Sequence, residues 1–165
     1  MDRRLDEILR MLRPEPGTKL WYGGASPVGS LRGMSAATAS WKPSPKRHSI
    51  WELMLHIAYW EYAVRRVLED LPSGGFPRTS ADWPTVPDPG SEMLWREDRA
   101  LLRSEHDAIA EAIKRFDTHR LDELTRKGGS FWFIDLMHGV VMHNVYHTGQ
   151  IQLLKRLHGG RVKCE

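Results

Sequence analysis

The sequence contains a single cysteine, Cys164, among its 165 residues. One cysteine excludes an internal disulfide framework and a cysteine-rich zinc site. No apolar run approaches the roughly 18 residues that a membrane-spanning helix needs. Residues 1–7 are mostly charged and lack the apolar segment of a signal peptide. We therefore expect a cytoplasmic protein with no membrane partner.

Charge of one sign is also scarce, because 24 Lys and Arg against 21 Asp and Glu give a net charge of only +3 with histidine neutral. Such a small, scattered excess predicts no nucleic-acid partner. The hydrophobic share of 41% and the charged share of 27% are typical of a globular protein, and the length suits one domain over residues 1–165. Histidine and tryptophan, by contrast, are frequent, with eight and seven residues.

Apolar residues recur at steps of three and four, which predicts an all-α protein, and no segment alternates as a strand does. Long connections rich in Pro and Gly interrupt the pattern at residues 14–48 and 71–90. Short helical turns are expected at residues 27–32, 35–41 and 120–124, and Gly159-Gly160 is expected to end the last helix. The main predicted helices span residues 2–13, 49–70, 91–116 and 130–158. Together they favour a four-helix bundle with long crossover connections.

Two of the predicted helices carry histidines inside their apolar stripes. In the last helix His143 and His147 lie one turn apart on the stripe that also contains Val140 and Ile151. In the helix over 49–70, His56 follows the same inward step as Leu53. Each buried imidazole without a partner would cost about 1–3 kcal/mol, so three that converge need a common partner.

A divalent metal ion is the simplest such partner, because it accepts three neutral imidazole nitrogens at roughly 2.0–2.1 Å and leaves a position for water or substrate. Hydrogen-bonded core histidines and a proton relay are the alternatives. The sequence after His143 has Asn144 where a zinc peptidase has its glutamate, so that class is disfavoured. The remaining histidines are expected to be exposed or half-exposed: His48, His106, His119, His138 and His158.

Candidates for a supporting role follow from their spacing. Gln150 comes three residues after His147 and is expected beside it. Glu52 comes one turn before His56, where it either orients that imidazole or completes a capping box with Ser49.

Other polar and aromatic residues are predicted to lie outside the site or at its edge. Asn144 and Tyr146 are expected to project away from the ligands. Asp98 is expected on a solvated flank of its helix, with a position that reaches the cavity as the alternative. Trp60 is predicted in the core and Trp83 over a pocket, while Trp21 and Trp95 are weighed as pocket walls. The basic residues Lys42, Lys46 and Arg47 either form a solvated loop or attract an anionic cosubstrate.

At these residues the chain resembles the DinB-like, or YfiT-like, family. Residues 49–60, SIWELMLHIAYW, are similar to the second helix of that family. Residues 143–151, HNVYHTGQI, are similar to its last long helix, and residues 21–24, WYGG, resemble a segment found in some members. The resemblance extends from about residue 5 to residue 158.

The resemblance implies an up-down-down-up four-helix bundle and a homodimer. It implies one divalent metal ion on three histidines, which here are His56, His143 and His147. Three imidazoles suit zinc or nickel, with iron, manganese or cobalt as alternatives.

The characterised relatives imply a thiol-dependent S-transferase, in which a low-molecular-weight thiol such as bacillithiol is activated on the metal and added to a small electrophile. The alternatives are a metal-dependent hydrolase that uses metal-bound hydroxide, and a non-catalytic metal-binding dimerisation module. Cys164 is expected to be a tail residue rather than the nucleophile.

Overall fold

A computed structural model describes residues 2–15, 18, 24–72, 74–80, 82–86, 91–126 and 129–161. Within these residues the protein is helical, with a 3-10 turn at Thr118–Arg120 and an isolated bridge between Leu124 and Trp132. The α-helices are α1 (Arg3–Leu12), α2 (Pro27–Ser30), α3 (Ala36–Ser40), α4 (Ile50–Leu68), α5 (Glu92–Lys114) and α6 (Phe133–Arg161). The predicted roles of Trp21 and Cys164 lie outside the described residues, as does most of the WYGG segment.

Serine side chains start four of the helices. Ser49 begins α4 with the predicted capping box: its hydroxyl accepts the Glu52 backbone N–H, and the Glu52 carboxylate accepts the Ser49 N–H. The other oxygen of Glu52 accepts a hydrogen bond from Lys42 Nζ at 2.7 Å. Glu52 is therefore engaged by the cap and Lys42 and does not serve His56. The corresponding caps of α2, α3 and α5 are Ser26, Ser35 and Ser91.

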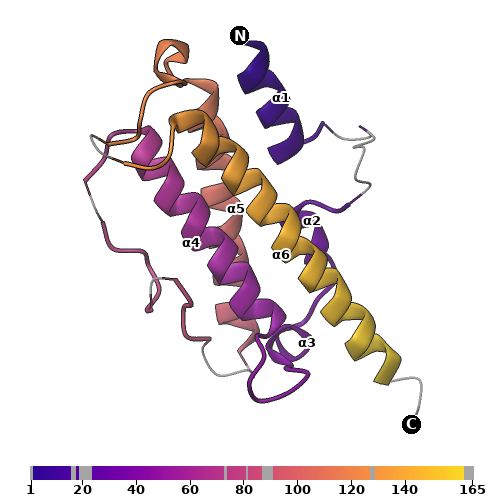
Figure 1. Ribbon diagram of the computed structural model, residues 1–165. Helices are drawn as coiled ribbons and strands as arrows, with labels where there is room; N and C mark the ends of the chain where they lie inside the picture. Colours follow the sequence, from indigo (N-terminus) through magenta and orange to yellow (C-terminus); the bar gives the residue numbers. More distant parts are fainter. Residues whose placement is uncertain are drawn as a thin grey trace.

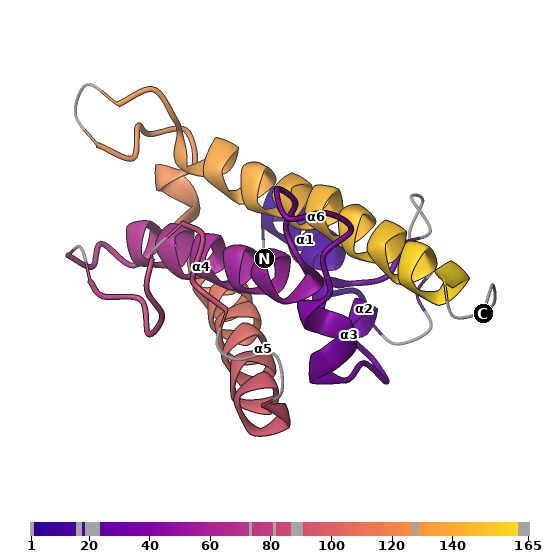
Figure 2. The same cartoon turned by 90° about the horizontal axis from the view of Figure 1, so that it is seen from below.

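The four longer helices form an antiparallel bundle (Figure 1). Helices α1 and α6 run in one direction, and α4 and α5 run in the other, which confirms the up-down-down-up order. Helix α4 packs against both α5 and α6, and α1 covers α5 and α6 on another side. The view from below shows α2 and α3 beside the start of α4 (Figure 2). The long connection before α4 thus places the start of α4 at the end of the bundle that lies far from the N-terminus (Figure 1).

Two apolar clusters fill the bundle, and a polar layer separates them. In α4 the buried apolar residues stop at Ala58 and resume near Val64, and α5 and α6 have corresponding gaps. One cluster includes Leu5, Ile109 and Phe133, and the other includes Trp51, Trp95 and Ile151. The gaps hold the buried polar residues Glu61, Glu105, His106, Asn144, His147 and Thr148.

The predicted ends of the last helix were wrong on both sides. Helix α6 starts at Phe133 rather than residue 130, because the preceding chain is tied back by hydrogen bonds from Phe133 N–H to the Glu123 carbonyl and from Ile134 N–H to the Leu121 carbonyl. It also continues through Gly159-Gly160 to Arg161. A glycine ends a helix only where the chain leaves the helical conformation, and here it does not. A helical turn was expected at residues 120–124. The structure instead has a 3-10 turn earlier in the chain, at Thr118–Arg120.

The predicted inward face of α4 was wrong near its middle. Trp60 is 39% exposed, whereas its neighbour Glu61 is fully buried. The spacing of apolar residues along α4 allows either residue to point inward, and hydropathy favours the tryptophan for the buried position. The carboxylate takes the inward position, where its Oε1 meets His106 of α5 and Asn144 of α6; its Oε2 is buried with no hydrogen-bond partner among the described residues.

Within the described part of the chain, no helix combines the length and the apolar character that crossing a membrane requires.

Candidate metal centre

Three histidines from two antiparallel helices meet at the centre of the bundle. His56 comes from α4, and His143 and His147 come from α6; one ring nitrogen of each lies within 4.8 Å of the others. The Nε2 atoms of His143 and His56 are 3.1 Å apart. A tetrahedral ion with bonds of roughly 2.0–2.1 Å holds its nitrogen ligands about 3.3 Å apart. The spacing of these two nitrogens is therefore close to that of a shared ion.

Two of the imidazoles are held by hydrogen bonds at their outer nitrogens. His56 Nδ1 lies 2.6 Å from the carbonyl oxygen of Asp82, and His147 Nδ1 lies 2.7 Å from Oε1 of Gln150. Both acceptors fix the proton on Nδ1 and leave the Nε2 lone pair free. The structure thus places Gln150 beside His147, as its spacing predicted.

The donor set fits a cation better than it fits a hydrogen-bonded cluster. One hydrogen bond between His143 and His56 satisfies a single pair among the three imidazoles. A cation accepts a lone pair from each of the three rings, which no single proton does.

Burial keeps these histidines in the form that binds metal. Burial lowers the pKa of His143 to about 4, and the neighbouring His147 and His56 add to this effect. Burial also lowers the pKa of His147 and of His56, more than Gln150 and Asp82 raise them. Neutral imidazoles at neutral pH need not lose a proton before they bind a metal.

The connection between α4 and α5 covers one side of the cluster. The Trp83 ring stacks on His56 with centroids 3.8 Å apart and on His48 with centroids 3.7 Å apart. Trp60 Nε1 donates a hydrogen bond to Asp82 Oδ1 at 2.8 Å, which holds the same segment in place. Trp83 therefore covers the site, as predicted from its place in the proline-rich connection.

A pocket of about 530 Å³ opens beside the cluster. Its lining includes His147, Gln150 and Trp83, together with three leucines of α6, Leu153, Leu154 and Leu157. Small molecules can therefore approach at least one of the histidines. None of the described residues that line this pocket is an aspartate or glutamate.

The burial of His106 and Asp98 contradicts their predicted placement, whereas Asn144 projects away from the histidine cluster, as predicted. Asn144 is 3% exposed and donates a hydrogen bond from Nδ2 to Glu61 Oε1 at 2.7 Å. His106 is 5% exposed, and its Nδ1 lies 2.6 Å from the same oxygen. We call Glu61, His106 and Asn144 the Glu61 network; it joins α4, α5 and α6 next to the histidine cluster.

Asp98 is the other residue whose predicted placement was wrong. It is fully buried and accepts hydrogen bonds from Trp51 Nε1 at 2.7 Å and from Arg78 Nε at 2.6 Å. The ion pair with Arg78 anchors the α4–α5 connection to α5. Asp98 therefore supports the covering segment and does not belong to the metal centre.

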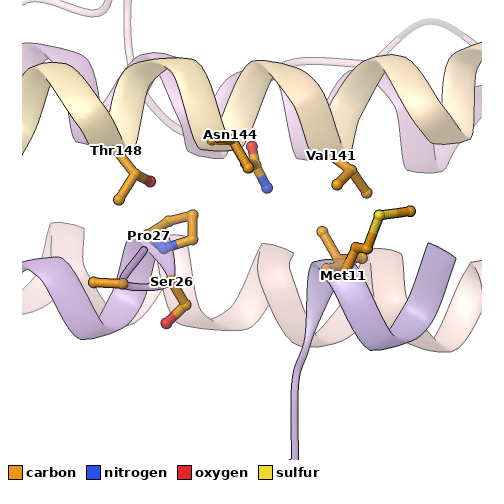
Figure 3. A pocket seen from close by; sticks show the side chains of 9 residues that line it. Met11, Ser26, Pro27, Val141, Asn144 and Thr148 are labelled. Carbon is orange, nitrogen blue, oxygen red and sulfur yellow. The ribbon is translucent and has the colours of Figure 1, made fainter. Parts of the chain in front are cut away.

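A much smaller cavity lies on another side of α6, where Asn144 and Thr148 point toward Ser26 and Pro27 (Figure 3). Its volume is about 10 Å³, close to the space that one water molecule needs. Asn144 Oδ1 and Thr148 Oγ1 are buried and have no hydrogen-bond partner among the described residues. The cavity is too small for a substrate.

The other residues singled out in the sequence lie away from the cluster or at its edge. His119 and His138 are exposed and His158 is half-buried against Trp41, as predicted. Trp95 belongs to the core rather than to a pocket wall, and its Nε1 donates to the Met34 carbonyl.

Fold and site together define a class of protein: an antiparallel helical bundle in which two neighbouring helices present three histidines suited to a metal ion. The family model described as the DinB superfamily matches residues 28–151, well over half of the chain. The chain belongs to the DinB superfamily. Comparisons with curated proteins and with solved structures found no match.

Proposed function

We propose that this protein is a metal-dependent enzyme that holds one divalent ion on His56, His143 and His147. The observation that carries the proposal is the convergence of three neutral imidazoles beside an open pocket. Membership of a superfamily whose proteins bind metals supports it. Three imidazoles suit zinc or nickel, and also iron, manganese or cobalt.

The reaction we propose is the transfer of a low-molecular-weight thiol, such as bacillithiol, to an electrophilic carbon. When bound, a divalent ion would lower the pKa of a thiol or a water that ligates it. A sulfur–carbon bond forms while the bond from carbon to the leaving group breaks, and the thiol proton passes to solvent. The apolar side chains of the pocket exclude water from the electrophile, and Gln150 and Asp82 hold the rings of His147 and His56.

The pocket lining supports thiol transfer because the leucines of α6 and Trp83 give the approach to His147 an apolar surface that suits an organic electrophile. Hydrolysis would instead use metal-bound hydroxide, and His48 in the same lining is the described residue that could move a proton to the leaving group. Hydrolysis and a non-catalytic metal-binding module are the other outcomes of the test below.

The first experiment is elemental analysis of protein purified without a polyhistidine tag or nickel resin, beside His56→Ala and His143→Ala. We expect about one metal ion per chain in the wild type and little in either variant. His138→Ala is the matched control, because His138 lies on α6 but is exposed. Wild-type protein that takes up no zinc, nickel or manganese after chelation and reloading would overturn the proposal.

The second experiment separates the reaction classes. Metal-loaded protein is supplied with a thiol and chlorodinitrobenzene, and separately with activated esters and no thiol. Thiol consumption that depends on metal and on His143 supports the transferase, and ester cleavage without thiol supports the hydrolase. A bound metal without turnover in either assay supports the non-catalytic module.

The homodimer that the family resemblance implies stays a prediction. Several large apolar side chains on α6 are exposed, including Met142 at 73% and Tyr146 at 63%, and a partner that covered them would gain apolar burial. Sedimentation velocity on the full chain tests this state directly.

A further inference from the structure

The pocket beside His147 extends well beyond the histidine cluster. One wall is α6 from His147 to Leu157, which at 1.5 Å per residue spans about 15 Å. The facing residues come from the segment 43–48 and include Arg47. The pocket is therefore long enough to hold a molecule that reaches from the cluster along α6.

The wall on α6 is strongly apolar, although it faces solvent. Leu153 is 57% exposed and Leu157 is 47% exposed, and both line the pocket together with the buried Leu53 and Leu154. A ligand with an apolar body would remove this surface from water and gain the corresponding hydrophobic free energy.

Arg47 gives the pocket a positive charge that no described acidic side chain neutralises. No ion pair or side-chain hydrogen bond of Arg47 occurs among the described residues, whereas Lys42 pairs with Glu52 and Arg78 pairs with Asp98. A guanidinium group presents a planar set of donors that matches a carboxylate or another oxyanion. With no acidic side chain in the described lining, the pocket favours an anion over a cation.

We propose that this pocket binds an amphipathic organic anion, with its apolar chain or ring system on the leucines of α6 and its anionic group on Arg47. This inference rests on the proposed function in one respect: the anion would be the small-molecule substrate that meets the thiol at the metal centre. The binding itself requires only the pocket, so it can be tested independently of turnover.

The test is isothermal titration calorimetry with octanoate and, as its neutral counterpart, 1-octanol. Both are titrated into the protein as purified and after chelation, because a carboxylate could also ligate a metal ion. We expect octanoate to bind in both preparations and Arg47→Ala to weaken it about tenfold, as the loss of a charge-assisted contact predicts. Octanol should bind wild type and Arg47→Ala equally.

Lys46→Ala is the matched control, since Lys46 is an exposed neighbour with the same charge but does not line the pocket. Its affinity for octanoate should stay within about twofold of wild type, because only a diffuse charge is lost. Leu157→Ser should weaken both ligands. Circular dichroism and metal content should be unchanged in all three variants, which separates a failure of this inference from a failure of the metal centre.

Three results would overturn the inference. If wild type and Arg47→Ala bind octanoate with equal affinity, Arg47 does not hold the anionic group. If Lys46→Ala loses as much octanoate affinity as Arg47→Ala, the positive charges act only by general electrostatic attraction. The third result has two parts: the protein is a dimer that does not bind octanoate, and Leu153→Glu converts this dimer to a monomer in sedimentation velocity. That result shows that a second copy of the chain covers the leucines instead.

Discussion

Buried histidines occur in two adjacent regions of the bundle, and their pKa values move in opposite directions. In the metal centre, burial lowers the pKa of His143 to about 4. In the Glu61 network, burial also acts to lower the pKa of His106, but the hydrogen bond and charge of Glu61 outweigh it and raise the pKa. The partner therefore decides the role of a buried histidine: a carboxylate keeps it charged and structural, whereas converging lone pairs make it a ligand.

The two regions share helix α6, where consecutive residues face them. His143 faces the metal centre and the next residue, Asn144, donates to Glu61. Glu61 Oε1 accepts from both Asn144 and His106, so one carboxylate connects three helices. We infer that the two regions are separable by mutation, since one set of side chains converges on the proposed metal position and the other connects the helices.

The largest effect we expect is on metal binding. His143→Ala should bring the metal content from about one per chain to near zero, because two imidazoles rarely retain a divalent ion in competition with water. His106→Gln should leave the content unchanged, although that histidine is more buried than His143. Elemental analysis of the two variants side by side measures this contrast. Equal loss of metal in both would show that the regions are not separable.

The next largest effect is on stability. Glu61→Gln should lower the free energy of unfolding by about 3 kcal/mol, since removing one partner of a buried ion pair leaves the other uncompensated. Urea unfolding of the chelated protein measures this without a contribution from metal. Glu111→Gln, which breaks an exposed pair with Lys114 on α5, should cost less than about 1 kcal/mol. A similar cost for the two variants would contradict the structural role of the network.

A smaller effect is expected from the residue that holds His147. Gln150→Leu removes the acceptor of His147 Nδ1–H and should weaken metal affinity about 10–100-fold. Competition with a chromophoric chelator gives the affinity, and the visible spectrum of the cobalt-loaded protein reports any change in ligand geometry. Gln152→Leu serves as control, because Gln152 lies on α6 outside the pocket lining. Affinity unchanged in Gln150→Leu would mean that this hydrogen bond does not position the ring.

The sequence predicted the convergence of the three histidines better than it predicted the Glu61 network, for a physical reason. His56, His143 and His147 stand out because each interrupts an apolar stripe with a group that has metal-ligand chemistry. Glu61 and Asn144 also interrupt the apolar stripes of their helices. Hydropathy, however, assigns the inward position to a more apolar neighbour, as it did with Trp60 in place of Glu61. Whether a carboxylate is buried depends on donors from other helices, and no local spacing contains that information.

The same distinction explains the errors elsewhere. The starts of α4 and α5 were predictable because Ser49 and Ser91 cap these helices by accepting hydrogen bonds from backbone N–H groups three residues later. The burial of Asp98 was not predictable from local spacing, because its partner Arg78 lies twenty residues away in the connection between α4 and α5. The end of α6 was missed because glycine permits a helix stop without enforcing one.

The smallest effect concerns the pH dependence of stability, and it isolates His106. A histidine with a raised folded-state pKa contributes stability that is fully present below its unfolded pKa, 6.5, and is lost as the pH rises through the folded value. The metal-centre histidines titrate at lower pH because their folded-state pKa values are lowered. Above 6.5 the pH dependence therefore reports the network rather than the cluster.

We expect the difference in unfolding free energy between wild type and His106→Gln to narrow from about pH 6 to about pH 9. Besides Glu61, the charged groups that act on His106 are Asp107, which raises its pKa, and Arg13, which lowers it. Asp107→Asn should therefore keep most of the narrowing, since Glu61 has the larger influence. Urea titrations of chelated protein across this range measure the difference. A gap that stays constant with pH would mean that His106 is neutral in the folded protein, and the contrast between the two regions would then rest on geometry alone.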